Sequence, residues 1–136
     1  MELIFSVPGR PHGKARPFFT GKRAITPSST RAYETTVQWC ATQAMRSEGY
    51  AQAVDAPCRV WLILDFAVPK SASKKQREEC LNGRIVPVCK PDADNCAKAL
   101  LDGMNGIVYA DDRQVFQLSV AKRYWSEDKV EVLVEW

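Results

Sequence analysis

The sequence predicts a single-domain α+β protein: a four-stranded mixed β-sheet with helices packed on it, in the order β-α-β-α-α-β-β. Three observations favour this class. The length of 136 residues suits one domain. Four segments alternate apolar and polar residues as strands do, and three segments carry helical spacing or helix boundary signals. A sheet covered by helices would bury all of these apolar faces.

In the first half of the chain we expect a strand, a long loop, a helix and a second strand, at residues 2–7, 8–29, 29–46 and 58–67. Leu3, Phe5 and Val7 alternate with Glu2, Ile4 and Ser6, as in a strand. The loop is rich in Gly, Pro and basic residues, and loops of this length usually serve a function. Apolar residues at helical spacing mark the helix, with Ser28 or Ser29 as its cap.

In the second half we expect two helices followed by two strands, at residues 73–81, 94–105, 115–123 and 129–136. Asn-Gly pairs at 82–83 and 105–106 end the two helices. Residues 126–128 resemble a hairpin turn, which would make the last two strands neighbours in the sheet. Within the last helix, Cys96, Leu100 and Met104 are expected to face the core.

Composition narrows the class of protein. The net charge is only +3, but residues 10–23 hold five Lys or Arg and no acid. Five cysteines without a C-x-x-C pair favour a reduced, cytoplasmic protein and disfavour a zinc site. The longest apolar run, residues 60–64, is too short to span a bilayer, so no membrane partner is expected.

Clustered carboxylates are the most informative feature. Asp92 and Asp94 stand just before a helix, Lys98 follows one turn later, and Asp102 continues the same helix face. The pair Asp111-Asp112 comes after that helix, and a short return would bring one of the two beside the first pair. Several carboxylates in one place repel each other unless a cation lies between them. Their oxygens are the ligands that a hard divalent cation such as Mg²⁺ prefers.

Each acidic pair also has a structural explanation. Aspartates commonly cap helix starts, and an Asp-Asp pair before a strand is an ordinary turn. Neither pair alone indicates chemistry. The combination D-x-D-N, a lysine four residues later and then D-D-x-Q-V makes the structural explanation less satisfactory.

That combination resembles the RusA family of Holliday junction resolvases. The matching segments are residues 90–95, Lys98, residues 99–106 and residues 111–115, together with a basic N-terminal part at residues 7–17 and Thr26-Pro27. The resemblance covers most of the chain. Two departures stand out: only Lys90 is basic before the D-x-D motif, where a well-known bacterial member has several arginines, and Cys96 replaces the usual Leu.

The resemblance implies a Mg²⁺-dependent, homodimeric, structure-specific DNA endonuclease, commonly of phage or prophage origin, with Mn²⁺ as a substitute metal. Asp92, Asp94 and Asp112 match the family's metal-binding catalytic aspartates, and Lys98 matches its catalytic lysine. Asp111 and Asp102 are secondary candidates. The expected partner is branched DNA, above all the Holliday junction, cut by paired symmetric incisions in recombination and repair.

DNA contacts are expected from cations that can bind phosphates, namely Lys14, Arg16, Lys22, Arg23 and Lys90. Phe18 and Phe19 lie among them and could stack on an unpaired base, but docking on the core is the preferred interpretation of these two rings. His12, the only histidine, is expected to lie in the loop, remote from the acids. Trp61, Trp125 or Trp136 could supply a dimer interface.

Three alternatives remain open. The first is a metal-dependent nuclease acting on flaps or other branched DNA. The second is a non-catalytic nucleic-acid-binding module whose acids only cap and turn. The third, a small phosphoesterase acting on nucleotides, is disfavoured because the basic loop suits a polymer.

Overall fold

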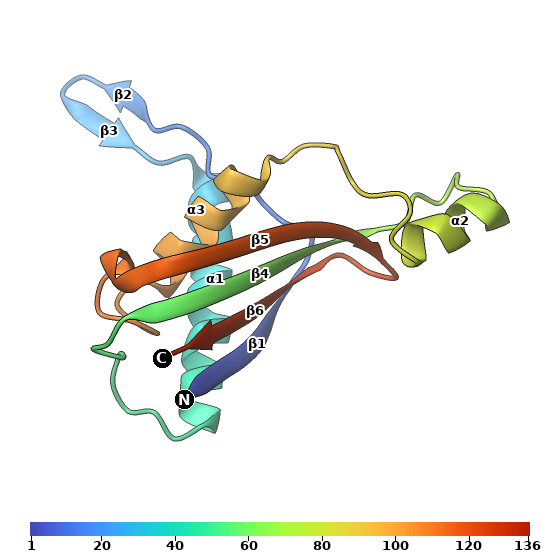
Figure 1. Cartoon of the computed structure of the whole chain (residues 1–136). Helices are drawn as coiled ribbons and strands as arrows, with labels where there is room; N and C mark the ends of the chain where they lie inside the picture. Colours follow the sequence, from blue (N-terminus) through green and yellow to red (C-terminus); the bar gives the residue numbers. More distant parts are fainter.

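The computed structural model describes all residues, 1–136, and shows a mixed sheet with helices on one face (Figure 1). The strands are β1 Glu2–Pro8, β2 Phe18–Thr20, β3 Arg23–Ile25, β4 Cys58–Ala67, β5 Val115–Trp125 and β6 Lys129–Glu135. The helices are α1 Ser28–Ser47, α2 Lys74–Leu81, α3 Ala93–Met104 and the 3-10 turn η1 Asp112–Gln114. The predicted α+β class and the four-stranded mixed sheet are confirmed.

The sheet has the order β1-β6-β4-β5, antiparallel except for the parallel pair β4 and β5. The predicted hairpin at residues 126–128 is therefore wrong, because β4 lies between β5 and β6. The connection instead passes over the end of β4, where Asp128 Oδ1 accepts a hydrogen bond from the Ala67 N–H at 2.8 Å. This hydrogen bond satisfies the backbone N–H of Ala67 at the end of β4, where the connection from β5 to β6 passes.

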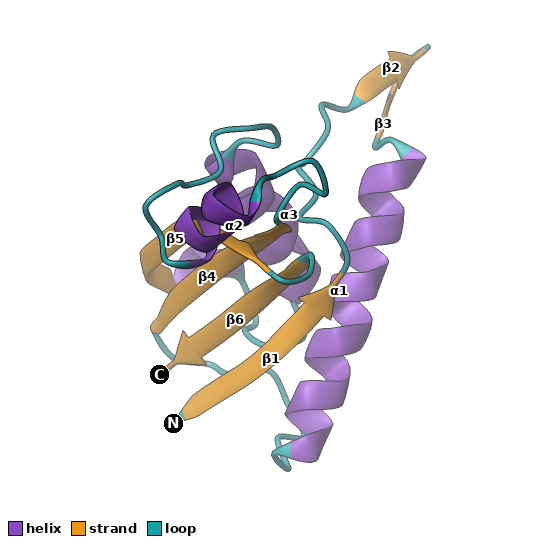
Figure 2. Ribbon diagram, turned by 90° about the vertical axis from the view of Figure 1, so that its right-hand side faces the viewer, coloured by secondary structure: helices purple, strands orange, loops and turns teal.

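Helices α1 and α3 pack side by side on one face of the sheet (Figure 2). They are in tight contact at Gly103, where a Cβ atom would lie 2.6 Å from Cγ1 of the buried Val37. The predicted serine cap of α1 is wrong, since Pro27 occupies the cap position without a side-chain hydrogen bond. None of the helices has the length and apolar character needed to cross a membrane.

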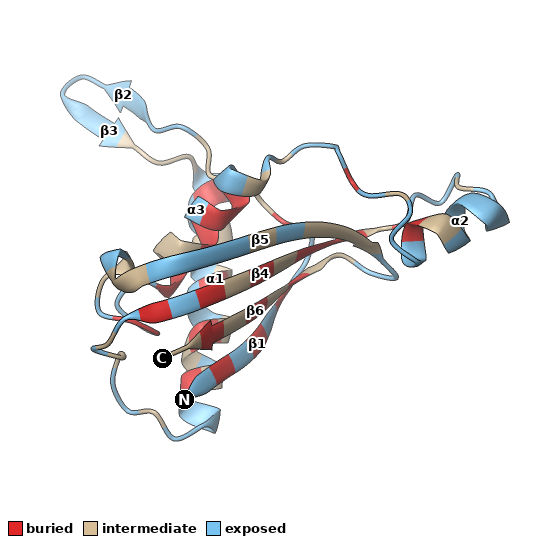
Figure 3. Ribbon diagram, viewed as in Figure 1, coloured by how far each residue is buried: buried red, intermediate tan, exposed pale blue.

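The two faces of the sheet differ in burial (Figure 3). Alternate residues of β1, β4 and β6 are buried beneath the helices, as the period-two pattern predicts. On the opposite face Ile4 is 66% exposed, and Trp61, Ile63 and Leu133 are only partly buried. This second face, called here the open face, has no covering element in the chain.

Two segments project from the domain in different directions (Figure 1). One is α2, at the position predicted for a short polar helix. It begins with a capping box, in which Ser73 and Gln76 exchange side-chain and backbone hydrogen bonds. The other is the hairpin of β2 and β3, which lies inside the segment predicted to be loop. Its strands of three residues are too short to produce a readable alternation.

Candidate active site

Helix α3 presents two different faces. Cys96, Leu100 and Met104 are buried against the sheet, as predicted from their spacing. The outward face carries Asp94, Lys98 and Asp102 in successive turns, which follows from a spacing of four residues. The core therefore fixes the orientation of the helix that bears the charged groups.

Asp92 and Asp94 lie at the start of α3 with exposed carboxylates. Asp92 occupies the N-cap position but makes no capping hydrogen bond. Neither carboxylate takes part in a side-chain hydrogen bond or an ion pair within the protein. Both lie near the positive end of the helix dipole, which attracts negative charge. Two carboxylates in this state can accept a ligand without breaking an internal contact.

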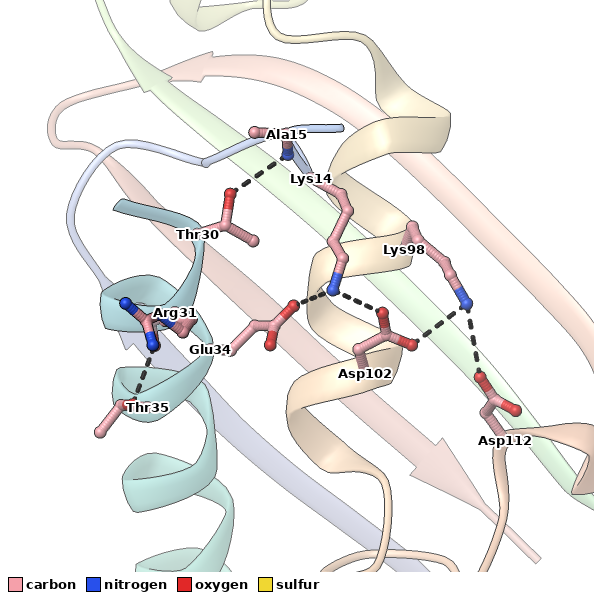
Figure 4. A network of polar contacts seen from close by, with 9 residues as sticks. All are labelled: Lys14, Ala15, Thr30, Arg31, Glu34, Thr35, Lys98, Asp102 and Asp112. Atoms are coloured by element: carbon pink, nitrogen blue, oxygen red, sulfur yellow. Dashed lines mark hydrogen bonds and ion pairs between the residues drawn. The ribbon is translucent and has the colours of Figure 1, made fainter. Parts of the chain in front are cut away.

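A chain of ion pairs extends from Lys98 across the outward face of α3 (Figure 4). Nζ of Lys98 lies 3.2 Å from Oδ1 of Asp102 and 3.9 Å from Oδ2 of Asp112. The other oxygen of Asp102 lies 3.0 Å from Nζ of Lys14, which also bonds to Glu34 of α1. The network thus joins the basic N-terminal segment, α1, α3 and the turn before β5.

Asp111 and Asp112 point to different places, as expected for neighbours in an extended segment. Asp112 contacts Lys98, whereas Asp111 accepts a hydrogen bond from the Arg113 N–H at 2.9 Å and caps η1. Gln114 fixes this turn from the other side, because its side-chain amide donates to the carbonyls of Val54 and Ala56. Asp112 is therefore the member of the pair that faces α3.

A cavity of about 470 Å³ adjoins Asp92. It is lined by Arg10, Pro11, His12, Gly13, Lys14, Lys90, Pro91, Asp92 and Asn95. Three Lys or Arg side chains face one carboxylate, so the cavity is positive overall. Gly13 permits this arrangement, because a Cβ there would approach Cβ of Pro91 to 3.0 Å.

His12 is not remote from the acids, contrary to the expectation from the sequence. It lines the same cavity as Asp92, and its ring stacks on Tyr33 with centroids 5.4 Å apart. The loop returns to α3 through a backbone hydrogen bond from Lys14 to Asn95, which the sequence pattern does not reveal. Nδ1 of His12 is buried without a hydrogen-bond partner.

The basic residues named from the sequence fall into two groups. Arg16, Lys22 and Arg23 are exposed on or beside the β2–β3 hairpin, and Lys90 is exposed at the cavity. Lys14 is instead partly buried between Glu34 and Asp102. Burial lowers the pKa of Lys14, but its hydrogen bonds to the two acids outweigh this, so that its pKa is raised. It stays charged at neutral pH.

Burial also changes two groups behind the charged face. It raises the pKa of the Cys96 thiol to about 11, with Lys122 opposing the shift and Asp92 and Asp94 adding to it. It raises the pKa of Tyr109, whose hydroxyl donates to the carbonyl of Leu101 at 2.8 Å. Both groups are neutral at physiological pH, so the charge of the site comes from its aspartates and lysines.

The donor chemistry of Asp92, Asp94 and Asp112 suits a hard cation, since all are carboxylates and the first two lack protein partners. The three are not gathered around a common point: no group of three or more His, Cys, Asp or Glu side chains in the structure is close enough to hold a metal. Lys98 is the group that stands next to Asp112.

Glu34 is the member of the network that was missed from the sequence. It shares the inward-facing stripe of α1 with Thr30, Val37 and Ala41, all of which are buried. An acid on the apolar stripe of an amphipathic helix usually has a cationic partner. That spacing could have revealed Glu34 before the structure was known.

Comparison with known proteins gives two matches. The family model described as "Endodeoxyribonuclease RusA" matches residues 8–135. The uncharacterized protein YqaN of Bacillus subtilis strain 168 is 33% identical over 127 residues, which is 93% of this chain and 86% of that protein. Both matches include the N-terminal basic segment as well as α3 and η1.

Proposed function

Because this chain belongs to the RusA family of endodeoxyribonucleases, we propose that it is a Mg²⁺-dependent endonuclease that resolves four-way DNA junctions by paired symmetric incisions. The observation that carries the proposal is the position of Lys98. It stands between Asp102 and Asp112, on the same helix face as the unpartnered Asp94, and the positive cavity adjoins Asp92 at the start of that helix. A cytoplasmic protein of phage or prophage origin fits this role.

The positive cavity supplies the first step, binding of the DNA backbone. Arg10 and Lys90 can each contact a phosphate, and Lys14 adds charge from its fixed position between two acids. Such contacts bind DNA of any sequence and release counterions, so that affinity falls steeply with salt. They would place the backbone across the start of α3.

The carboxylates and Lys98 supply the chemistry. Asp92, Asp94 and Asp112 would hold Mg²⁺, or Mn²⁺ in its place, once their side chains are drawn together around the ion. Bound there, the ion would acidify a water molecule and neutralise charge on the phosphate oxygens. Lys98, held by Asp102, would stabilise negative charge developing on the phosphate or on the leaving oxygen.

A homodimer would place two such sites on one junction. A four-way junction has near two-fold symmetry, and a two-fold dimer presents identical sites to opposing strands. The open face of the sheet suits the interface, since Ile4, Trp61, Ile63 and Leu133 line an apolar groove of about 360 Å³ there. In sedimentation velocity, the chain should run at about twice its 15.3 kDa mass, and Trp61→Lys should run as a monomer.

Cleavage of synthetic DNA tests the function. The full chain is incubated with labelled four-way, three-way, flap and linear substrates, with Mg²⁺ or with EDTA. The proposal expects Mg²⁺-dependent incisions at symmetric positions in opposing strands of the four-way junction. Equal cutting of flaps would favour the broader nuclease, and junction binding without any cutting would favour a non-catalytic module.

A further inference from the structure

The β2–β3 hairpin exposes large apolar side chains that the rest of the domain does not cover. Phe19 is 77% exposed and Phe18 is 51% exposed. The preference for docking of these rings on the core is therefore wrong. Burial of a phenylalanine side chain typically contributes about 1.5–3 kcal/mol of favourable free energy. Two uncovered rings on one small hairpin therefore indicate a binding surface.

The hairpin holds the two rings on opposite sides. Consecutive strand residues point to opposite faces. Phe18 lies opposite Ile25 in the register and shares its face with that side chain, whereas Phe19 lies opposite only Ala24. The two-residue turn after Thr20 uses Gly21 at a φ of +64°, a conformation that glycine adopts freely. Phe19 thus has only the small side chain of Ala24 as its cross-strand neighbour, and its exposed ring is accessible to a planar group of a ligand.

The positive charge of the hairpin indicates which kind of partner the exposed ring would bind. Arg16, Lys22 and Arg23 are exposed on or beside the same hairpin, and no acid occurs between residues 3 and 33. A wholly apolar protein surface would leave these cations without counter-charges. A nucleic acid supplies phosphates for the cations and planar bases for the ring, and stacking of one base on an aromatic contributes about 1–3 kcal/mol.

The base of the hairpin is fixed to the candidate active site. The Ala15 N–H donates to Oγ1 of the buried Thr30 at 3.2 Å, and Lys14 is bound by Glu34 and by Asp102, the partner of Lys98. Figure 1 shows the hairpin projecting beyond the end of α3 that bears Asp92 and Asp94. The hairpin therefore extends past the candidate active site, so that DNA longer than this site would meet it.

We propose that the hairpin inserts Phe19 into the branch point of the DNA, where it stacks on a base that has lost its pairing partner or its stacking neighbour. The inference rests on the proposed function and adds a device for recognising the branch. Bases within an arm are paired and stacked, and their opening costs a few kcal/mol. A single ring can therefore distinguish a branch from an arm without reading sequence.

The test uses the full chain, EDTA to prevent cutting, and four-way junctions with 2-aminopurine either at the branch point or in the middle of one arm. The unmodified protein should change the fluorescence of the branch-point probe and leave the arm probe unchanged. Phe19→Tyr keeps a ring and should keep the response. Phe19→Leu keeps an apolar side chain without a ring and should lose it, with roughly tenfold weaker binding to the junction and equal binding to a linear duplex.

Trp39→Ala is the matched control, because Trp39 is a similarly exposed aromatic on α1. It should behave as the unmodified protein. The inference is overturned if Phe19→Leu keeps the response, if the unmodified protein gives none, or if Phe19→Leu changes the sedimentation mass while DNA binding stays the same. Cutting of the four-way junction in Mg²⁺ is measured in a separate assay. If the fluorescence test fails while the junction is still cut, the role of Phe19 is refuted and the proposed function stands.

Discussion

Asp102 binds Lys98 from one helical turn further along α3, with 3.2 Å between Oδ1 and Nζ. Its second oxygen is bound by Lys14. Because Lys14 fixes Asp102, the position of Lys98 depends on a residue of the N-terminal segment. Under the proposed function, Lys98 would act on DNA, whereas Asp102 and Lys14 would hold Lys98 in place.

Asp102→Asn should slow cleavage while leaving binding nearly intact. Lys98 would lose its nearest anion, and misplacement of a catalytic group commonly costs about tenfold to a hundredfold in rate. The loss should appear in kcat rather than in KM for the junction, because the lysine is proposed to act on the transition state. Asp102→Glu should recover part of the rate.

Glu48→Gln is the control for that experiment, because Glu48 is exposed at the C-terminal end of α1, away from Glu34, and makes no ion pair. Its kcat should equal that of the unmodified protein. A kcat for Asp102→Asn equal to that of the control would rule out the positioning role.

Asp94→Asn should abolish cleavage and leave the fold and junction binding unchanged. The Asp94 carboxylate makes no internal hydrogen bond, so the stability change should lie within about 0.5 kcal/mol. Thermal unfolding and electrophoretic mobility shifts check the two retained properties. Cleavage at the normal rate by this variant would remove Asp94 from the catalytic set.

Lys22→Ala should weaken DNA binding, whereas Lys14→Ala should lower the stability of the fold. Lys22 is exposed on the hairpin, so its loss should weaken DNA binding and reduce the slope of log K against log salt by about 1 without changing stability. Loss of Lys14 leaves Glu34 and Asp102 without their shared cation, and the free energy of unfolding should fall by about 1–3 kcal/mol. Chemical denaturation and salt titration separate the two; identical profiles would contradict the assignment.

Cysteine alkylation should follow burial. Cys89 is exposed and should react first with iodoacetamide at pH 8, whereas the buried Cys96, with a pKa of about 11, should stay protected until the chain unfolds. Because the folded pKa exceeds the ordinary value of 9.0, the contribution of this thiol to stability is full below pH 9 and is lost as the pH rises through about 11. Mass spectrometry of peptides identifies the modified residues.

Gly103→Ala should destabilise the protein although alanine is the better helix former. The added Cβ would meet the side chain of Val37 at 2.6 Å, and such overpacking typically costs about 1–3 kcal/mol. Val37→Ala creates a cavity instead, so the double variant should lose less than the sum of the single losses. Additive losses in urea denaturation would show that the two residues do not compete for space.

The class of fold and most element boundaries were predictable because they depend on local periodicity. Helix α3 was predicted at residues 94–105 and is found at Ala93–Met104, since its apolar stripe and its Asn-Gly end signal are unambiguous. The order of strands was not predictable in the same way. The alternation of apolar and polar residues in β5 and β6 does not indicate that β4 lies between them in the sheet.

The candidate site was predictable in part for the same reason. A spacing of four residues places Lys98 beside Asp102, and this contact is present. The contacts of Lys14 with Glu34 and Asp102, and the approach of His12 to Asp92, join segments far apart in the sequence. Such contacts depend on the path of a 22-residue segment, which composition describes only as a loop.

The two faces of helix α3 link the stability of the core to the position of the charged groups. Leu100 and Met104 anchor the helix in the core, while Lys98 and Asp102 form an ion pair on its other side. A core substitution that tilts the helix would move both charged groups together, so heat resistance and turnover should decline in parallel among such variants. Changes confined to the hairpin or to α2 do not move α3, so their effects on DNA binding should be separable from effects on heat resistance and turnover.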